Sequence, residues 1–248
     1  MIYIKKGPPQ RNVASKIAEI KRTPKWKAIP ETRPTDQESQ SGYGDTLRNY
    51  FDQLPKNEIR ESVLKEQHYL CAYCMRPLPN VESVIVEHWY PLSQARDTAI
   101  DYNNFLGSCN GLYSDGQQIR SCCDDHKSGK CITIDPRKEW MMDCIKYERN
   151  GTIYFDAPDW LDDKQRRAID NDINQTLCLN GKESELTLHR ERVLLSCKKQ
   201  LTKLHIQKKC TVANVKKLIQ SIEEQEQYPA YAGVMLFYYK RWLKNHPQ

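Results

Sequence analysis

The side chains best suited to chemistry gather in the middle of the chain, where cysteine, histidine and acidic residues occur at short spacings. Cys71 and Cys74 form a C-x2-C pair, and on a tight turn such a pair presents two thiolates to one zinc ion at about 2.3 Å. Polar turn residues surround Cys109 and Cys123, the best candidates for a second pair, with Cys122 as the nearest competitor. The spacing therefore predicts a structural zinc ion held by four thiolates.

Ten cysteines occur in the chain, and no apolar run is long enough for an export signal or a membrane-spanning helix. Mean hydropathy is −0.79. We therefore expect a cytoplasmic protein without membrane contact, in which the cysteines stay reduced and available to metal. The cysteines that lack metal-ligand spacing are predicted to be thiols of the core: Cys131, Cys144, Cys178, Cys197 and Cys210.

An acid and a histidine end a predicted strand, in which Val84-Ile85-Val86 runs into Glu87 and His88. Successive strand residues point to opposite faces, so one of these side chains can bind metal while the other acts on water. Taken alone, the Glu-His pair is weak evidence for a catalytic site, because most such pairs are ordinary strand ends. It becomes a strong signal in combination with the cysteines, with Asn104 and with the later Asp124-Asp125-His126-Lys127 segment.

Together these segments resemble the HNH endonucleases of the ββα-metal class. The family pattern is a C-x2-C knuckle, an acid-His strand end followed by Pro-Leu-Ser, an Asn-Leu segment leading to a cysteine, and a cysteine followed by a polar metal ligand and a lysine. The resemblance covers residues 60–135. The matching segments are Cys71-x2-Cys74, Glu87-His88-Trp-Tyr-Pro91-Leu92-Ser93, Asn104-Phe-Leu with Cys109, and Cys123-Asp124-x-x-Lys127.

The resemblance implies a role for each matched residue. His88 would be the general base of phosphodiester hydrolysis, and Asn104 would hold its loop and orient it. Glu87, with either Asp124 or His126, would bind a catalytic Mg²⁺ or Mn²⁺ ion. The matched cysteines would hold the structural zinc ion.

Two features depart from the family pattern. Residues 110–121 separate Cys109 from Cys122 and Cys123, whereas the family usually keeps its two C-terminal cysteines close together. The residue after the last cysteine is often His or Asn in the family, but here it is Asp124, with His126 two positions on. Either of these side chains is therefore a candidate ligand of the catalytic metal.

The distribution of charge bears on possible partners. The net charge is +6 in total; residues 1–60 and 156–248 are net basic, and residues 61–155 are net acidic. An acidic centre collects divalent cations, so the flanks or a partner must supply affinity for a nucleic-acid backbone. Within the centre, Lys127 and Lys130 are the candidate phosphate contacts. The sequence does not distinguish DNA from RNA as the substrate.

The layout of the whole chain is similar to the HNH component of Septu-type antiphage systems, including those attached to retrons. That resemblance implies a nuclease effector whose cutting is controlled by a separate ATPase subunit. The chain has no Gly-Lys-Ser/Thr phosphate loop of its own, so any ATP dependence must come from another chain.

The resemblance implies that an α+β fold with a zinc-stapled ββα-metal HNH core positions these residues. We expect a basic extended arm over residues 1–55, the HNH nuclease core with its structural zinc over 56–157, and a helical C-terminal region over 158–248. In the arm, only residues 12–22 are predicted to be helical, and residues 36–44 are predicted to form a loop.

Local patterns predict further elements in the core and the C-terminal region. A helix is expected over residues 57–68, and Asn150-Gly151 predicts the turn of a hairpin between strands near 145–148 and 152–155. Apolar residues at helical spacing predict helices that pack through one apolar stripe each. These C-terminal helices are expected at residues 163–176, 185–207, 212–226 and 230–245.

A second function from a different class also fits the sequence. Cys71, Cys74, Cys123 and His126 match a C-x2-C…C-x2-H zinc site that only shapes a surface for binding nucleic acid or protein. In that case the Glu87-His88 pair would be incidental.

Overall fold

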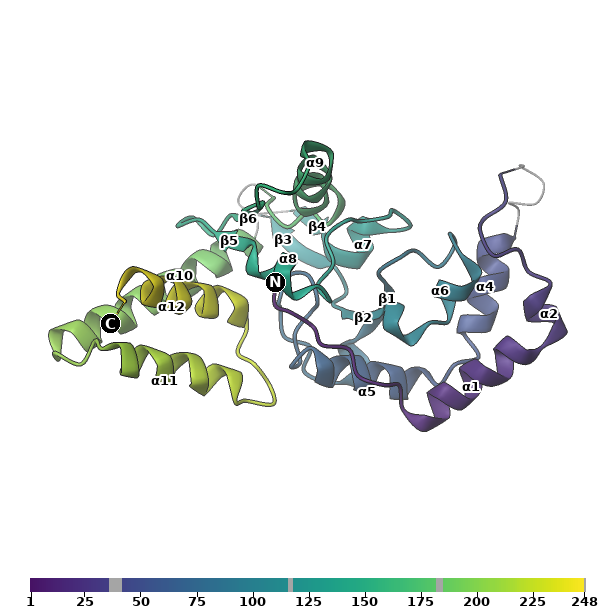
Figure 1. Cartoon of the computed structure of the whole chain (residues 1–248), viewed down its shortest axis with the longest axis horizontal. Helices are drawn as coiled ribbons and strands as arrows, with labels where there is room; N and C mark the ends of the chain where they lie inside the picture. Colours follow the sequence, from purple (N-terminus) through teal and green to yellow (C-terminus); the bar gives the residue numbers. More distant parts are fainter. Residues whose placement is uncertain (36–41, 116–117, 182–184, 248) are drawn as a thin grey trace.

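The computed structural model of the chain describes residues 1–35, 42–115, 118–181 and 185–247. Figure 1 shows helices of the N-terminal part on one side, a central region with small β-sheets, and C-terminal helices on the other side. The three sheets of the described residues are two-stranded and antiparallel. The predicted α+β class is therefore confirmed.

Two strands and a short helix form the centre of the fold. Strand β1 (Ile85–His88) pairs antiparallel with β2 (Phe105–Ser108), so that the last two residues of β1 lie opposite the first two of β2. Helix α5 (Lys56–Glu66) packs against both strands, and α7 (Cys123–Lys127) follows an insertion after β2. The strand and the helix predicted around residues 57–88 are both present, with shifted ends.

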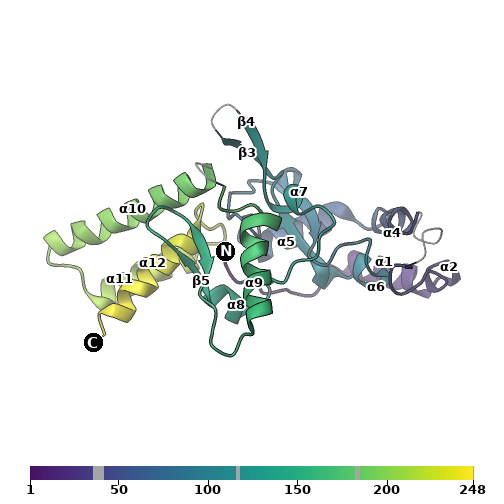
Figure 2. The same cartoon turned by 90° about the horizontal axis from the view of Figure 1, so that it is seen from above.

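The remaining central elements are short. The insertion after β2 forms a hairpin, which Figure 2 shows projecting away from the core. A second hairpin surrounds the Asn150-Gly151 turn, as predicted. These hairpins and the connecting helices are β3 (Leu112–Asp115) with β4 (Gln118–Ser121), β5 (Ile145–Tyr147) with β6 (Ile153–Phe155), η1 (Val81–Ser83), α6 (Arg96–Ala99), η2 (Tyr102–Asn104) and α8 (Glu139–Asp143).

The helix predicted within the first 55 residues is present as α1 (Arg11–Arg22), but this region differs from the extended arm that we expected because α2 (Pro24–Lys27) and α4 (Tyr43–Phe51) are helical as well. In α4, apolar residues spaced four apart form a stripe that is fully buried. The only buried residue of α2 is Trp26. The loop predicted at residues 36–44 lies mostly outside the described residues, and its last two residues begin α4.

The C-terminal region is helical, as predicted. Its helices are α9 (Asp163–Asn171), continued by the π-helical turn η3 (Asp172–Thr176), then α10 (Glu185–Ile206), α11 (Val212–Glu223) and α12 (Ala232–Asn245). Helix α12 packs against both α10 and α11. None of the helices in the described ranges is both long and apolar enough to cross a membrane.

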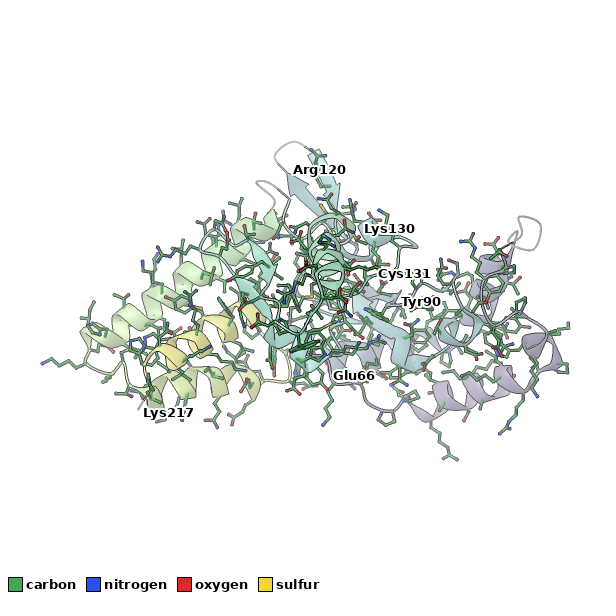
Figure 3. All side chains as sticks on the ribbon, turned by 45° about the horizontal axis from the view of Figure 1, so that its top comes forward. Glu66, Tyr90, Arg120, Lys130, Cys131 and Lys217 are labelled. Atoms are coloured by element: carbon green, nitrogen blue, oxygen red, sulfur yellow. The ribbon has the colours of Figure 1, made fainter. Side chains whose placement is uncertain are left out.

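The prediction that five cysteines are core thiols holds for only one of them. Cys197 is buried in α10, whereas Cys144, Cys178 and Cys210 are half-buried. Cys131 is exposed, and Figure 3 labels it beside Lys130, in the loop after α7. That prediction failed because burial depends on tertiary packing, which the sequence around a lone cysteine does not specify.

The turn of the β5–β6 hairpin packs tightly on the first turns of α10. Gly151 has a φ of 83°, in the left-handed region, and a Cβ added there would lie 2.0 Å from the carbonyl oxygen of Thr187. Only glycine fits this position, because a side chain would collide with the α10 backbone.

Substitution of this glycine is the first test of the packing. Gly151→Ala is expected to lower the free energy of unfolding by about 2–4 kcal/mol through strain and collision. The matched control is Gly129→Ala, where an added Cβ meets nothing within 4 Å; its effect should stay within about 0.5 kcal/mol. Urea unfolding measures both, and equal stability of the two variants would contradict the close packing on α10.

Candidate metal and catalytic sites

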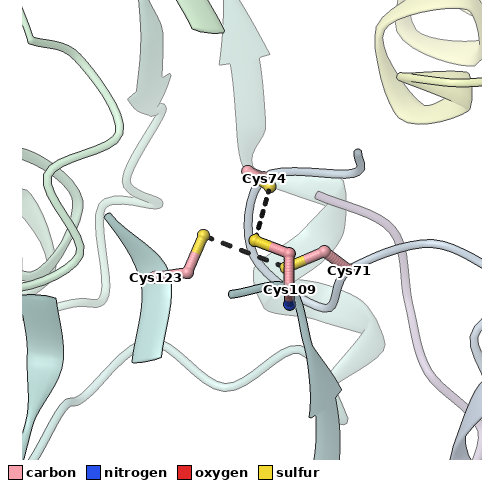
Figure 4. A group of neighbouring side chains, drawn as sticks. All are labelled: Cys71, Cys74, Cys109 and Cys123. Carbon is pink, nitrogen blue, oxygen red and sulfur yellow. Dashed lines mark hydrogen bonds between the residues drawn. The ribbon is translucent and has the colours of Figure 1, made fainter. Parts of the chain in front are cut away.

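Four buried cysteines converge on one point. The sulfur atoms of Cys71, Cys74, Cys109 and Cys123 all lie within 4.8 Å of one another. Figure 4 shows the group, in which Cys71 and Cys123 are 3.9 Å apart and Cys74 and Cys109 are 3.7 Å apart. Four sulfurs bound tetrahedrally to zinc are about 3.8 Å from each other, given Zn–S bonds of about 2.3 Å. The group therefore fits a zinc ion.

The first pair sits on a tight turn attached to β2. The Cys71 amide donates to the carbonyl of Arg76 at 2.9 Å, and the Met75 amide donates back to the Cys71 carbonyl at 3.1 Å. Met75 has a φ of 63°, which closes the turn. The Ala72 amide donates to the Gly107 carbonyl, so the turn is fixed to the strand that leads to the next cysteine.

The insertion brings the second pair together despite its length in sequence. Cys109 directly follows β2, and its amide lies 3.4 Å from the Cys71 sulfur. The Cys122 amide donates to the Gly111 carbonyl at 2.7 Å, which closes the base of the β3–β4 hairpin. Cys123 then begins α7 inside the group, whereas Cys122 is not among its four members.

Arg76 is a cation in contact with these sulfurs. Its guanidinium donates to the sulfur of Cys109 at 3.1 Å and to that of Cys74 at 3.4 Å. Zinc with four thiolates carries a net charge of about −2, so a cation in this place offsets part of it. Sequence reasoning missed Arg76; its position two residues after the C-x2-C pair was the available signal.

Glu87 lies at the end of β1 and is 3% exposed. Its Oε1 atom accepts from Lys127 Nζ at 2.7 Å and from the Tyr73 hydroxyl at 3.1 Å. Burial, and then hydrogen bonding with the Asp124 carboxyl group, raises the pKa of Glu87 well above its usual value, while Lys127 opposes that rise. The structure thus brings together Glu87 and Asp124, two carboxyl groups of the kind that bind Mg²⁺ or Mn²⁺.

His88 is the neighbouring strand residue and is held in one orientation. Its Nε2 lies 3.0 Å from the Ala99 carbonyl oxygen, and because a carbonyl only accepts, Nε2 carries the proton and Nδ1 is left as the acceptor. The rings of Phe51 and Phe105 pack edge-on against the imidazole. Burial lowers the pKa of His88 to about 3, so the imidazole is neutral at pH 7.

Asn104 holds the backbone on both sides of this histidine. Its Nδ2 donates to the carbonyls of Tyr90 at 2.8 Å and Thr98 at 3.0 Å, and its Oδ1 accepts from the Tyr90 amide at 2.8 Å. Thr98 precedes Ala99, which accepts the His88 hydrogen bond. Asn104 therefore fixes both the loop that follows His88 and the segment that orients its ring.

The two candidate phosphate contacts lie in different surroundings. Lys127 is 1% exposed, and it donates to the His88 carbonyl at 2.9 Å in addition to its ion pair with Glu87. That placement differs from the expected phosphate contact, because a buried lysine engaged by a carboxylate does not reach a surface ligand. Lys130 is exposed and is labelled in Figure 3 at the surface after α7.

His126 lies apart from the carboxyl pair. Its Nδ1 is 3.2 Å from the Thr176 carbonyl oxygen in η3. Within the described ranges, the four cysteines are the only group of three or more metal-ligating side chains within 4.8 Å of one another. His126, Glu87 and Asp124 therefore do not form a group of this kind in the described residues.

No protein-family model matches this sequence, and no curated protein matches it as a relative. What the chain does must therefore be inferred from the chemistry of its own side chains.

The assignment of the zinc ligands can be tested with neighbouring cysteines. Cys123→Ser should lower zinc affinity by about 100-fold or more, because a thiolate ligand is lost from a site whose binding energy is large. Cys122→Ser is the matched control and should retain one zinc ion per chain. Elemental analysis after dialysis against a weak chelator measures both. Full zinc in the Cys123→Ser protein, or loss of zinc from both variants, would contradict the assignment.

Proposed function

We propose that this protein is a metal-dependent endonuclease of the HNH, ββα-metal type, which hydrolyses phosphodiester bonds in nucleic acid. The observation that carries the proposal is the arrangement at the end of β1. There a neutral histidine with a fixed ring lies next to a buried carboxylate, and a second carboxylate and a lysine reach the same place from α7. Strand β1 and helix α7 supply all of these groups, and β2 pairs with β1.

His88 would act as the general base. With the proton on Nε2 committed to Ala99, Nδ1 can take a proton from water as the water oxygen attacks phosphorus. The bond from phosphorus to the 3′ oxygen then breaks, and that oxygen leaves. A positioned base of this kind contributes about 10²–10⁴-fold to the rate. Asn104 would preserve the geometry by holding the backbone around the ring.

Glu87 and Asp124 would hold the Mg²⁺ or Mn²⁺ ion. When bound, such an ion stabilises the negative charge that develops on the phosphate and on the leaving oxygen. Lys127 would position Glu87 rather than contact the substrate, since its ammonium group is buried against that carboxylate. Asp124 is favoured over His126 as the ligand from α7, because the His126 ring is engaged with Thr176.

With Lys127 engaged, the cations that remain near His88 are Arg48 of α4 and Lys56, the first residue of α5. Lys56 Nζ lies over the Phe51 ring, 2.7 Å from its centroid, and the exposed Arg48 guanidinium lies 5.4 Å from the same centroid. Both charges act on His88, where they help to lower its pKa. The exposed Arg48 would therefore contact the phosphates next to the scissile bond, whereas Lys56 is ion-paired with Asp52 at 3.2 Å.

We also propose a biological setting on the basis of the Septu-type resemblance. The protein would be the nuclease effector of a bacterial antiphage complex, and an ATPase subunit would control when it cuts. The alternative of a non-catalytic zinc module with His126 as the fourth ligand is less well supported, because Cys109 occupies that place in the buried group.

The general base provides the direct test of the activity. His88→Ala should lower the rate of cleavage of DNA or RNA by about 10²-fold or more, in keeping with the loss of a positioned base. His205→Ala is the control, because His205 is exposed on α10. The assay follows cleavage by zinc-loaded protein with and without Mg²⁺ or Mn²⁺. It is repeated with ATP and any ATPase that is encoded by a neighbouring gene. Equal cleavage rates of the wild type and the folded His88→Ala protein in every condition would refute the proposed nuclease activity.

The metal ligand on α7 can be identified separately. Asp124→Ala should abolish cleavage at low Mn²⁺, with partial recovery as Mn²⁺ is raised, because one carboxylate ligand is missing. His126→Ala, two residues further along the same helix, should leave the Mn²⁺ dependence unchanged. The reverse pattern would transfer the ligand role to His126.

A further inference from the structure

Arg190 is a buried cation whose described partners are all neutral. It lies on α10 and is 1% exposed. Its guanidinium donates to the carbonyl of Gly151 at 2.6 Å, to the carbonyl of Leu179 at 2.7 Å and to the side-chain oxygen of Asn180 at 3.2 Å. No carboxylate in the described part of the chain forms an ion pair with it. A buried charge without a counter-ion is strongly unfavourable, so its compensation has to come from elsewhere.

The cysteine group is a source of negative charge that acts on Arg190. Burial lowers the pKa of Arg190, and this shift is opposed by Tyr147 and Tyr231 and, after them, by Cys74 and Cys123. A zinc ion with four thiolates carries a net charge of about −2. Arg76, which donates to the sulfur of Cys109, provides one positive charge. Arg190 provides a second, and the assembly is then neutral.

Backbone hydrogen bonds tie the C-terminal region to both pairs of zinc ligands. The Cys123 amide donates to the Leu177 carbonyl at 2.9 Å, in the turn whose Leu179 carbonyl binds Arg190. On the other side, the Tyr231 amide donates to the carbonyl of Met75 at 3.0 Å. Met75 directly follows the C-x2-C pair. The zinc ligands therefore lie at the junction between the core and the helices.

Helix α10 meets this junction with two consecutive side chains. His189 Nδ1 lies 3.2 Å from the Tyr231 hydroxyl, and the next residue is Arg190. Tyr231 leads directly into α12, which packs on both α10 and α11. The α10–Tyr231 contact therefore connects the turn of the C-x2-C pair to all three helices.

We propose that the zinc–thiolate centre is the counter-ion of Arg190 and that zinc occupancy docks the helices α10, α11 and α12 on the core. Docking of these helices by zinc does not depend on nuclease activity. Because coupling between two equilibria is reciprocal, docking must strengthen zinc binding by the factor by which zinc strengthens docking. Removal of the Arg190 charge, through which the two are coupled in this proposal, must therefore weaken zinc binding.

The test replaces the charge and follows two quantities in the full-length protein. Arg190→Met should weaken zinc affinity by about tenfold or more, within the range of typical coupling. In the zinc-loaded variant, amide hydrogen exchange in α10 should accelerate by a similar factor, while exchange in α5 stays as in the wild type. Arg192→Met is the control, because Arg192 is exposed on the same helix. Arg190→Lys should recover most of the zinc affinity, since it restores the charge.

Wild-type zinc affinity and wild-type α10 protection in a folded Arg190→Met protein would overturn the proposal. Failure of Arg190→Lys to recover affinity would also overturn it, because hydrogen bonding rather than charge would then be responsible. If Arg190→Met does not fold, the proposal is tested instead by measuring hydrogen exchange of the wild-type protein during a zinc titration. Protection of α10 must rise with zinc occupancy, and equal protection in zinc-free and zinc-loaded protein would contradict the coupling.

Discussion

The convergence of four cysteine thiolates on one point is the constraint on which the rest of the structure depends. The ligands come from a tight turn, from the end of β2 and from the start of α7. A helix of five residues is not stable in isolation, so α7 must be fixed by its surroundings. Its first residue, Cys123, belongs to the buried cysteine group, and its last residue, Lys127, forms an ion pair with Glu87. The cysteine group that could hold zinc and the proposed catalytic groups therefore share one short helix.

Burial determines the chemistry of the proposed active site. A histidine with a pKa of about 3 is neutral at physiological pH, and its single fixed hydrogen bond decides which nitrogen can accept a proton. The carboxyl group beside it has a raised pKa and a carboxyl neighbour, an arrangement that a divalent cation relieves by offsetting the negative charge. Both properties arise from packing around β1, which explains why a weak sequence signal such as Glu-His acquires a defined geometry.

The sequence predicted the elements that carry a local pattern. The C-terminal helices were recognisable from their apolar stripes, and the β5–β6 hairpin from Asn150-Gly151. Cys71 and Cys74 were recognisable from their C-x2-C spacing, and Cys109 and Cys123 from the polar turn residues around them. Helix α4 was missed because its short stripe of Tyr43, Leu47 and Phe51 lies in a segment whose composition indicates disorder. The contacts of Arg190 depend on tertiary packing, so no local pattern could indicate them, whereas Arg76 had its position two residues after Cys74 as a signal.

Helix α7 is predicted to contribute a ligand to each of two different metal ions, Cys123 to zinc and Asp124 to Mn²⁺. A crystal structure of the protein grown with zinc and Mn²⁺ tests this most directly. Anomalous scattering measured at the two absorption edges identifies each ion. The account predicts a zinc peak among Cys71, Cys74, Cys109 and Cys123, and a manganese peak between Glu87 and Asp124, beside His88. A zinc ion at any other place, or manganese bound only away from these carboxylates, would contradict it.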